Sequence, residues 1–162
     1  MTKTALLLFS ITACRPTRIA ECPLVDEAWI MEDPGGFYRC ADEILNKGDG
    51  CGEDGYLLGY AAKYAERYMW ETYPQLSPAG QGFLDRNLLC LQTVFRDTVQ
   101  ADWACDAVAE FAFKSHADCY LSSGICEISL SDRLTILMAV DVEDLNQPGQ
   151  DEAFSAIAEQ CN

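Results

Sequence analysis

Four cysteines in the middle of the chain constrain its fold more than any other feature. They stand at positions 90, 105, 119 and 126, so that they are separated by 15, 14 and 7 residues. A separation of 7 or 14 residues places two side chains on nearly the same face of an α-helix, about two or four turns apart. Apolar residues near and between the cysteines include positions three and four apart, such as Val108 with Phe111 and Ala112, which is typical of amphipathic helices. The pattern predicts two cross-linked helices with thiols on their buried faces. It therefore indicates an architecture, but it does not indicate an activity. These apolar residues are Leu89, Val94, Val99, Val108, Phe111 and Ala112.

The cysteine content also indicates the compartment. The chain of 162 residues contains nine cysteines and one histidine, and its length fits one domain. No C-x-x-C pair occurs, so zinc-ribbon and thioredoxin-like sites have no support. Scattered cysteines of this kind are typical of disulfides, which persist in oxidising compartments. We therefore expect an exported protein.

The first 13 residues have the pattern of an export signal. A short basic start, Met1–Lys3, precedes an apolar run at residues 5–13 that is too short for a stable membrane anchor. The run ends in Ile11-Thr-Ala-Cys14, which resembles a bacterial lipobox, the motif whose cysteine is lipidated and becomes the new N-terminus. The sequence predicts a signal peptide over residues 1–13 and lipidation of Cys14.

Two other interpretations of the N-terminus stay open, namely ordinary signal cleavage after Ala13 and a buried N-terminal strand. The parity of the cysteines favours lipidation, because removing Cys14 leaves eight, although an intermolecular disulfide would also use the odd one. The lipid would be the only attachment to a membrane, since no other segment is long and apolar enough to cross one. The expected location is a surface or periplasmic lipoprotein, and otherwise a secreted protein.

The rest of the sequence predicts an all-α fold, a compact disulfide-braced bundle of five to six helices. No segment longer than a few residues alternates with period two, and no Asn-Gly hairpin occurs. Residues 14–35 hold three prolines and a Gly-Gly pair, which predicts a tether or irregular arm with at most one short helix near residues 26–31. The helical domain covers 36–162, with helices expected at residues 37–47, 54–73, 77–99, 102–121, 131–140 and 150–160.

The expected helix starts rest on capping residues. Ser77 followed by Pro78 is a strong start, with a hydroxyl at the N-cap and proline at the first helical position. Asp54 and Asp102 are the predicted caps of the second and fourth helices, and Ser131-Asp132 is the predicted start of the fifth.

The charge of the chain limits its partners. Its 26 acidic and 11 basic residues give a formal net charge of −15. The negative electrostatic potential of such a chain repels nucleic acid and anionic lipid surfaces, and it attracts cations and basic proteins. The simpler interpretation is that the acidic residues keep an exported protein soluble.

Several motifs between about residues 40 and 161 resemble the stanniocalcins, secreted disulfide-rich helical hormones of animals. The shared text comprises a Cys-x-x-Asp-Gly motif at Cys51, Tyr60-Ala-Ala-Lys63, and a Gly82-x₅-Leu88-x-Cys90 motif. It continues with Cys105, Cys119-Tyr120, Cys126 and the stretch from Leu134 to Glu159-x-Cys161. Gaps of 14, 7 and 35 residues between the later cysteines agree with that family, and the gap of 15 is one short of it.

The resemblance implies a disulfide pairing that spacing alone cannot give, because eight cysteines allow about 105 pairings. The implied pairs are Cys51–Cys105, Cys90–Cys119 and Cys126–Cys161, and Cys22–Cys40 then follows by elimination. The resemblance also implies extracellular signalling linked to calcium and phosphate balance, with inhibition of a secreted metalloprotease as a known mode.

The sequence departs from the family pattern in three respects. Tyr60 stands where the family has a cysteine of a bridge within the second helix, and no N-x-S/T sequon occurs. The sequence has no counterpart of the tail whose cysteine links family members covalently. Any homodimer is therefore expected to be non-covalent.

His116 and Asp118 carry the main enzymatic alternative. His116-Ala-Asp118-Cys119-Tyr120 resembles the His-Asp-x-Cys-Tyr helix of secreted phospholipases A2, in which the histidine activates water and the aspartate binds calcium. Here an alanine separates the two residues, so they point about 200° apart on a helix. We expect His116 to be an ordinary surface or boundary residue. The sequence contains no Gly-x-Ser-x-Gly elbow of the kind that serine hydrolases use. Its single histidine likewise gives no support for a zinc site.

Two acidic clusters and a row of tyrosines are weaker binding candidates. Weak calcium binding and a solvated acidic face both remain open for the clusters, neither of which fits an EF-hand. The tyrosines, at intervals of four, allow a ligand groove but are more typical of core packing. The clusters are Asp49, Glu53 and Asp54, and Asp141, Glu143, Asp144, Asp151 and Glu152; the tyrosines are Tyr60, Tyr64 and Tyr68.

Three functional hypotheses follow from the sequence. The first is an exported stanniocalcin-like protein that binds an unidentified protein partner, has no cofactor and is not an enzyme. The second is a secreted hydrolase that uses His116 and Asp118. The third is an acidic, cation-binding structural protein of the cell surface.

Overall fold

The computed structural model describes residues 17–24, 31–146 and 150–161. These residues form helices, turns and loops with no strand among them, which confirms the predicted all-α fold. The predicted signal peptide, Cys14 and most of the short helix expected near residues 26–31 lie outside the described residues. None of the described helices combines the length and hydropathy needed to cross a bilayer.

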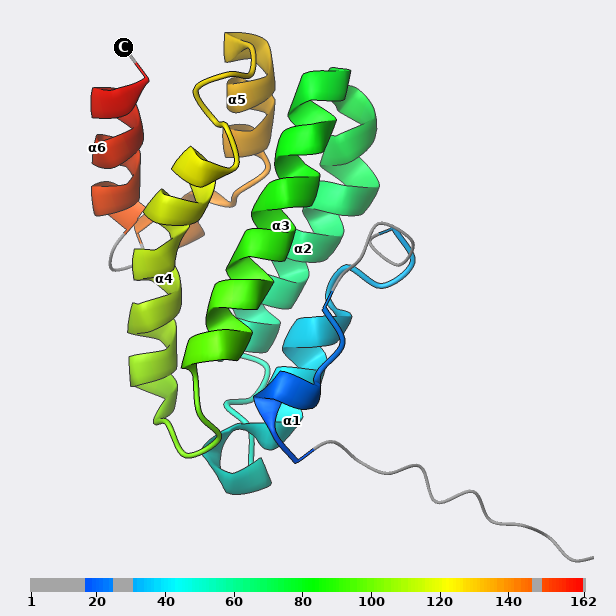
Figure 1. Ribbon diagram of the computed structural model, residues 1–162, viewed down its shortest axis with the longest axis vertical. Helices are drawn as coiled ribbons and strands as arrows, with labels where there is room; N and C mark the ends of the chain where they lie inside the picture. The colour runs from blue at the N-terminus through cyan, green and yellow to red at the C-terminus, as the bar shows by residue number, and fades with distance from the viewer. Residues whose placement is uncertain (1–16, 25–30, 147–149, 162) are drawn as a thin grey trace, which may run out of the picture.

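The helices follow the chain in the order shown by Figure 1. A single 3₁₀ turn, η1 (Ile19–Glu21), lies before α1 (Gly36–Gly48). One long composite helix comes next, made of η2 (Tyr56–Ala62), α2 (Lys63–Arg67), η3 (Tyr68–Thr72) and the 3₁₀ turn η4 (Tyr73–Gln75). The rest of the bundle is α3 (Pro78–Thr98), α4 (Cys105–Ser122), α5 (Leu130–Met138), the 3₁₀ segment η5 (Val142–Asn146) and α6 (Gln150–Gln160).

The composite helix and α3 run side by side through the bundle (Figure 1). α4 packs along α3, α6 packs on α4, and α1 packs on η2. α5 and α6 lie at the end of the bundle opposite to α1 (Figure 1). The largest fully buried side chains come from α1, the composite helix, α3 and α4, and they include Phe37, Leu57, Met69, Phe83 and Val108.

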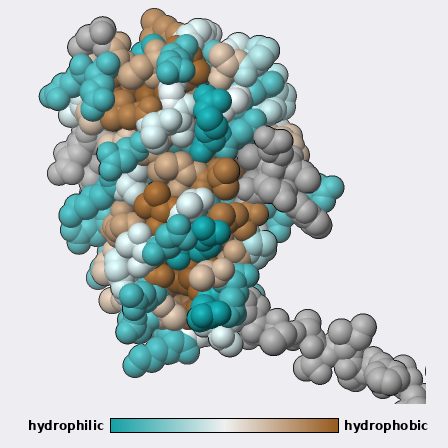
Figure 2. All heavy atoms as spheres, viewed as in Figure 1, coloured by the Kyte–Doolittle hydropathy of each residue, from teal (hydrophilic) through white to brown (hydrophobic). Residues whose placement is uncertain are grey.

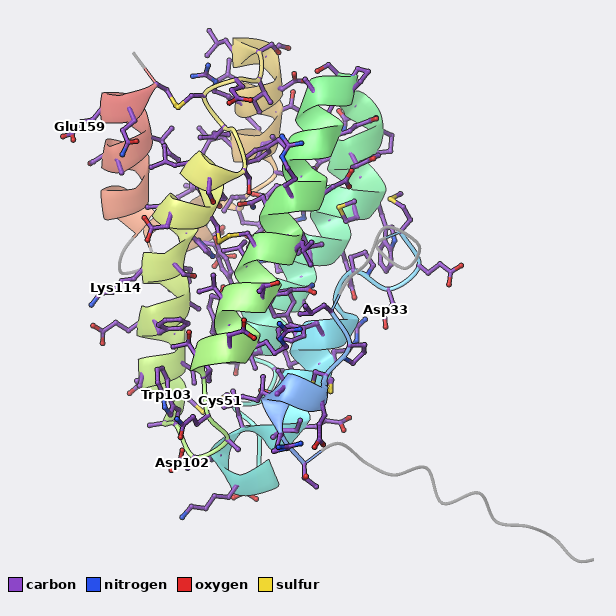
Figure 3. The ribbon with its side chains drawn as sticks, in the orientation of Figure 1. Asp33, Cys51, Asp102, Trp103, Lys114 and Glu159 are labelled. Atoms are coloured by element: carbon purple, nitrogen blue, oxygen red, sulfur yellow. A yellow bond between two sulfur atoms is a disulfide. The ribbon has the colours of Figure 1, made fainter. Side chains whose placement is uncertain are left out.

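The capping signals predicted some helix starts correctly and others wrongly. Ser77 caps α3 as expected, since its hydroxyl accepts a hydrogen bond from the amide of Gly80. Asp102 does not cap α4, which begins only at Cys105 with no side-chain cap. The side chain of Asp102 instead lies at the lower end of the molecule, in the turn before α4 (Figure 3). Asp54 likewise does not cap the composite helix, which starts after Gly55.

The start of α5 lies slightly earlier than Ser131-Asp132. Ser129 is its N-cap, because the Ser129 hydroxyl accepts a hydrogen bond from the Asp132 amide. The Asp132 carboxylate in turn accepts the Ser129 hydroxyl at 2.8 Å. This reciprocal arrangement resembles a capping box, in which cap and third residue satisfy each other.

The composite helix contains two π-helical stretches, η2 and η3. Their hydrogen bonds span five residues instead of four, so each turn is wider than an α-helical turn. Residues four apart drift by about 40° around an α-helix, and a wider turn rotates each residue by less. The π stretches therefore change the directions in which Tyr60, Tyr64 and Tyr68 point, compared with a regular α-helix.

Part of the N-terminal arm belongs to the core, as far as residues 17–24 and 31–35 describe the arm. Apart from η1, residues 17–24 contain no helix. Ile19 and Cys22 are nonetheless buried in the core cluster. The indole of Trp70 also donates a hydrogen bond to the Met31 carbonyl, which fixes the second described part of the arm to the composite helix.

Four disulfides cross-link the described elements; three are the pairs that the stanniocalcin resemblance implies, and the fourth, Cys22–Cys40, is the pair that was left by elimination. Cys22–Cys40 joins the arm to α1, and Cys51–Cys105 joins the loop after α1 to the start of α4. Cys90–Cys119 links α3 to α4, and Cys126–Cys161 holds the chain just after α6 to the loop after α4. Four such bonds indicate an oxidising, exported environment.

Candidate functional site

The structure separates the two residues of the enzymatic alternative. His116 is only 4 % exposed on the inner face of α4, so the expectation of a surface or boundary position was wrong. Asp118 is exposed two residues later. The histidine packs into the bundle because it shares its helix face with Ala112, Phe113 and Cys119, which are all buried. The structure therefore does not bring His116 and Asp118 together.

Aromatic side chains surround the buried imidazole. The Nε2 atom of His116 lies 3.2 Å from the hydroxyl of Tyr56. The rings of Tyr60, Phe113 and Tyr120 have centroids within 6.2 Å of the imidazole. Burial lowers the pKa of His116 to about 4, because an apolar environment disfavours the charged imidazolium. His116 is consequently neutral at pH 7.

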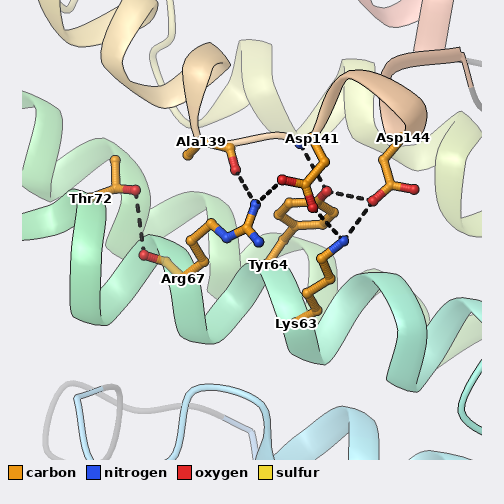
Figure 4. Close-up of polar contacts among 7 residues, drawn as sticks. All are labelled: Lys63, Tyr64, Arg67, Thr72, Ala139, Asp141 and Asp144. Atoms are coloured by element: carbon orange, nitrogen blue, oxygen red, sulfur yellow. Dashed lines mark hydrogen bonds and ion pairs between the residues drawn. The ribbon is translucent and has the colours of Figure 1, made fainter.

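Two carboxylates of the second acidic cluster, Asp141 and Asp144, pair with two bases of the composite helix (Figure 4). The ammonium of Lys63 lies 2.6 Å from the Asp141 carboxylate and 2.9 Å from that of Asp144. Arg67 lies 2.7 Å from Asp141 and also donates to the Ala139 carbonyl. We name this group, with Tyr64, the η5 ion network. Two of the predicted calcium ligands are therefore engaged as partners of protein cations.

Tyr64 couples the η5 ion network to the helix core. Its hydroxyl donates to Asp144 at 2.5 Å and accepts a hydrogen bond from the Asp141 amide at 3.0 Å. The hydrogen bonds from Tyr64 and then Lys63 lower the pKa of Asp144. Those from Arg67 and Lys63 hold the pKa of Asp141 well below its usual range. Both carboxylates remain ionised at every mildly acidic pH.

The remaining candidate calcium ligands are dispersed. Asp49, Glu53 and Asp54 are exposed in the loop between α1 and η2, and Glu143 is exposed in η5. The side chains of residues 151 and 152 lie outside the described part. Within that part, no three acidic, histidine or cysteine side chains converge as a metal site requires.

A cavity of about 140 Å³ lies where η3, α3, α4, α5 and α6 meet. Its wall is almost entirely apolar and aromatic, and among the described residues that line it Arg133 is the only one with a charged side chain. Two of the tyrosines in the four-residue series, Tyr60 and Tyr68, line it. The third, Tyr64, is part of the η5 ion network. The other lining residues are Phe83, His116, Tyr120, Ile125, Ile136, Leu137, Val140 and Ile157.

The surface near this cavity is apolar as well. Figure 2 shows hydrophobic atoms in the upper part of the visible face, and further hydrophobic patches among hydrophilic atoms across its middle and lower parts. Charged side chains such as Lys114 on α4 and Glu159 on α6 point away from the bundle (Figure 3). Leu137 lines the cavity and is also 38 % exposed, so the wall of the cavity reaches the solvent.

Sequence reasoning identified part of this site and missed the rest. The tyrosine series marked one wall, because Tyr60 and Tyr68 line the cavity. Tyr68 also packs against the core, in agreement with the core-packing interpretation, while the ligand groove stays a prediction. Arg133 and the residues of α5 and α6 were missed. They are far apart in sequence, and no local pattern shows that they share one space.

We compared the chain with family models, with curated proteins and with solved structures. No family model matches it. No curated protein and no solved structure matches it either.

Proposed function

We propose that the chain is an exported stanniocalcin-like binding protein that acts through a protein partner and not by catalysis. The single observation that carries the proposal is the pairing of Cys51–Cys105, Cys90–Cys119 and Cys126–Cys161. These are the pairs that the family resemblance implies, and eight cysteines allow about 105 alternatives. The family then implies a signalling or inhibitory role.

An exposed face of α5 supplies a surface for such a partner. Leu130, Leu134 and Met138 are exposed by 68 %, 48 % and 83 %, and they recur every four residues along one side of the helix. Contiguous exposed apolar patches mark interaction sites, and an apolar helix face with this spacing can dock into a groove of a partner. The net charge of −15 favours a basic extracellular protein over a second copy of this chain.

The two other hypotheses have less support. The hydrolase needs His116 and Asp118 in one site, and one is buried while the other is exposed. The cation-binding protein needs free carboxylates, and Asp141 and Asp144 are paired with Lys63 and Arg67. We therefore propose binding as the function and keep both alternatives as outcomes of the test.

The test is photo-crosslinking in the native extracellular medium. A photoreactive residue replaces Met138 in one variant and exposed Asp118, on α4, in the control. We expect one product specific to position 138 that disappears in a background carrying Leu134→Glu. Identical products at both positions would contradict the proposal. Calcium-dependent release of fatty acid from phospholipid, abolished by His116→Gln, would instead establish the hydrolase.

A further inference from the structure

We propose that the cavity bounded by η3, α3, α4, α5 and α6 binds a small carboxylic acid with an apolar, ring-sized body, and that Arg133 is the partner of its carboxylate. This inference goes beyond the proposed function and does not depend on it, because the cavity is separate from the outer face of α5.

The size and lining of the cavity define the body of the ligand. Its volume of about 140 Å³ is close to that of an engineered apolar cavity of roughly 150 Å³ that binds benzene. The aromatic part of the wall suits a ring, because aromatic rings pair favourably in edge-to-face and offset arrangements. This part consists of Tyr60, Tyr68, Phe83 and Tyr120. A single six-membered ring with a short substituent therefore fits, and a long acyl chain does not.

Arg133 defines the charged end. Its Nε and Nη2 atoms donate to the carbonyl oxygens of Cys126 and Ile128 at 3.1–3.2 Å. These bonds fix the guanidinium against the loop after α4. Among the described residues no carboxylate lies within ion-pair distance of Arg133, and Nη1 makes no hydrogen bond. A half-buried guanidinium beside an apolar cavity thus retains two donors for an anion.

The other described arginines show that this arrangement is selective. Arg18, Arg39, Arg67 and Arg96 each pair with an acidic side chain. Arg86 also lacks such a partner and donates to the Ser123 carbonyl, but it is exposed and lies outside the cavity wall. The chain has 26 acidic and 11 basic residues, and among the described side chains Arg133 is the cation that borders an apolar cavity without an acidic partner.

Neutral donors in the wall are compatible with an anionic ligand. Burial raises the pKa of Tyr120 to about 12 and that of Tyr68 well above its usual value. Both hydroxyls therefore keep their protons at neutral pH. Neither makes a hydrogen bond to another residue in the described ranges, so both are available to a ligand.

The net charge of −15 determines which acids bind. It repels every anion at long range, so a carboxylate without an apolar body gains too little to bind. A neutral molecule of the same shape gains the apolar contacts but leaves the guanidinium without its charge-assisted partner. Three probes separate the charge from the apolar body. Acetate has only the carboxylate, 2-phenylacetamide has only the apolar body, and phenylacetate has both.

The first experiment is calorimetric titration of the full, oxidised chain with these three probes. We expect phenylacetate to bind one to one and at least about tenfold more tightly than 2-phenylacetamide, the difference typical of one charge-assisted interaction. Acetate should give no binding. Equal affinities for phenylacetate and its amide, or no binding of either, would overturn the proposal.

Variants locate the site. Arg133→Gln should reduce phenylacetate affinity to that of the amide and leave amide binding unchanged. Val140→Trp should abolish both by filling the cavity. The matched control is Arg86→Gln, which removes another arginine that binds a carbonyl and has no carboxylate partner. If Arg86→Gln weakens phenylacetate as much as Arg133→Gln, the effect is general electrostatics and the proposal is wrong.

A measurement on the unsubstituted protein keeps the test valid if a variant does not fold. Methyl NMR of the isoleucines should show phenylacetate shifting Ile125, Ile136 and Ile157, which line the cavity. Ile19 and Ile44, which are buried in the core but do not line it, should remain unshifted. The opposite pattern would place any binding elsewhere and refute the assignment.

Discussion

His116 and Tyr56, sixty residues apart in sequence, meet in the bundle with the Nε2 atom 3.2 Å from the hydroxyl oxygen. Because the imidazole is buried, its pKa is lowered to about 4 from a usual value of 6.5. The unfolded chain binds a proton near pH 6.5, whereas the native protein resists protonation until about pH 4. Between these values the unfolded state holds more protons, so stability must fall as the pH is lowered.

The first prediction concerns this pH dependence. His116→Gln keeps a hydrogen-bonding partner for Tyr56 and does not titrate. We expect the wild type to lose about 3 kcal/mol of unfolding free energy between pH 6.5 and pH 4, and the variant to lose much less over that window. Urea unfolding at several pH values measures both slopes. Parallel slopes would mean that the imidazole is protonated in the native state.

The second prediction concerns Asp132, which joins the starts of two helices. Its carboxylate accepts the Ser77 amide at 3.0 Å, the Ser77 hydroxyl at 2.7 Å and the Ser129 hydroxyl at 2.8 Å. Ser77 and Ser129 are exposed while Asp132 is buried, so Asp132→Ala removes the shared acceptor of two helix caps but leaves its donors open to water. The loss of these charge-assisted bonds should destabilise the protein by about 1–3 kcal/mol. Thermal and urea unfolding provide the measurement. Asp118→Ala, at an exposed position, is the control and should change stability by less than about 0.5 kcal/mol.

The third prediction concerns the η5 ion network. Asp144→Asn keeps the shape of the side chain but removes the charge that accepts from Tyr64 and Lys63. We expect a loss of about 1–2 kcal/mol at pH 7. The pKa of Asp144 is lowered in the native state, so this contribution is present above the unfolded pKa near 3.8 and disappears as the pH falls further. A difference between wild type and variant that persists at pH 2 would contradict this account.

The fourth prediction concerns the attachment of α6. Cys126–Cys161 holds the end of this helix, and Ile157 packs against the core cluster. The double variant Cys126→Ala/Cys161→Ala should increase amide hydrogen exchange in α6 at least about tenfold, because the helix then opens without global unfolding. The matched control is Cys22→Ala/Cys40→Ala, which removes the bridge between the arm and α1. Unchanged exchange in α6, or equal acceleration by the control, would show that the bridge does not restrain the helix.

Some elements of the fold were predictable from local sequence. Ser77 followed by Pro78 predicts the start of α3, and the α6 boundaries agree with those expected from the break at residues 146–149. Asp54 and Asp102 were misleading, because a capping side chain acts only if the next residues already have helical conformation. Near Asp102 the chain first makes a turn, with the Trp103 amide bonded to the Gln100 carbonyl.

The burial of His116 was present in the sequence but was not recognised. Ala112, His116 and Cys119 follow the i, i+4, i+7 spacing of one helix face, and that spacing predicts a common environment. The cavity was not predictable in this way. Its wall combines Tyr68, Arg133 and Ile157, and their proximity depends on how η3, α5 and α6 pack together, which no local pattern encodes.

The order of the cysteines along the chain has a consequence for biogenesis. Cys22–Cys40 and Cys126–Cys161 stand apart, whereas Cys51–Cys105 and Cys90–Cys119 interleave, since Cys90 precedes Cys105. A chain that is translocated from its N-terminus and oxidised as thiols emerge would join Cys51 to Cys90 before Cys105 arrives. Thiol–disulfide exchange would then have to break the Cys51–Cys90 bond and form the native Cys51–Cys105 bond. Efficient maturation is therefore expected to depend on a disulfide isomerase, and a host whose export pathway only oxidises should accumulate a scrambled, soluble isomer.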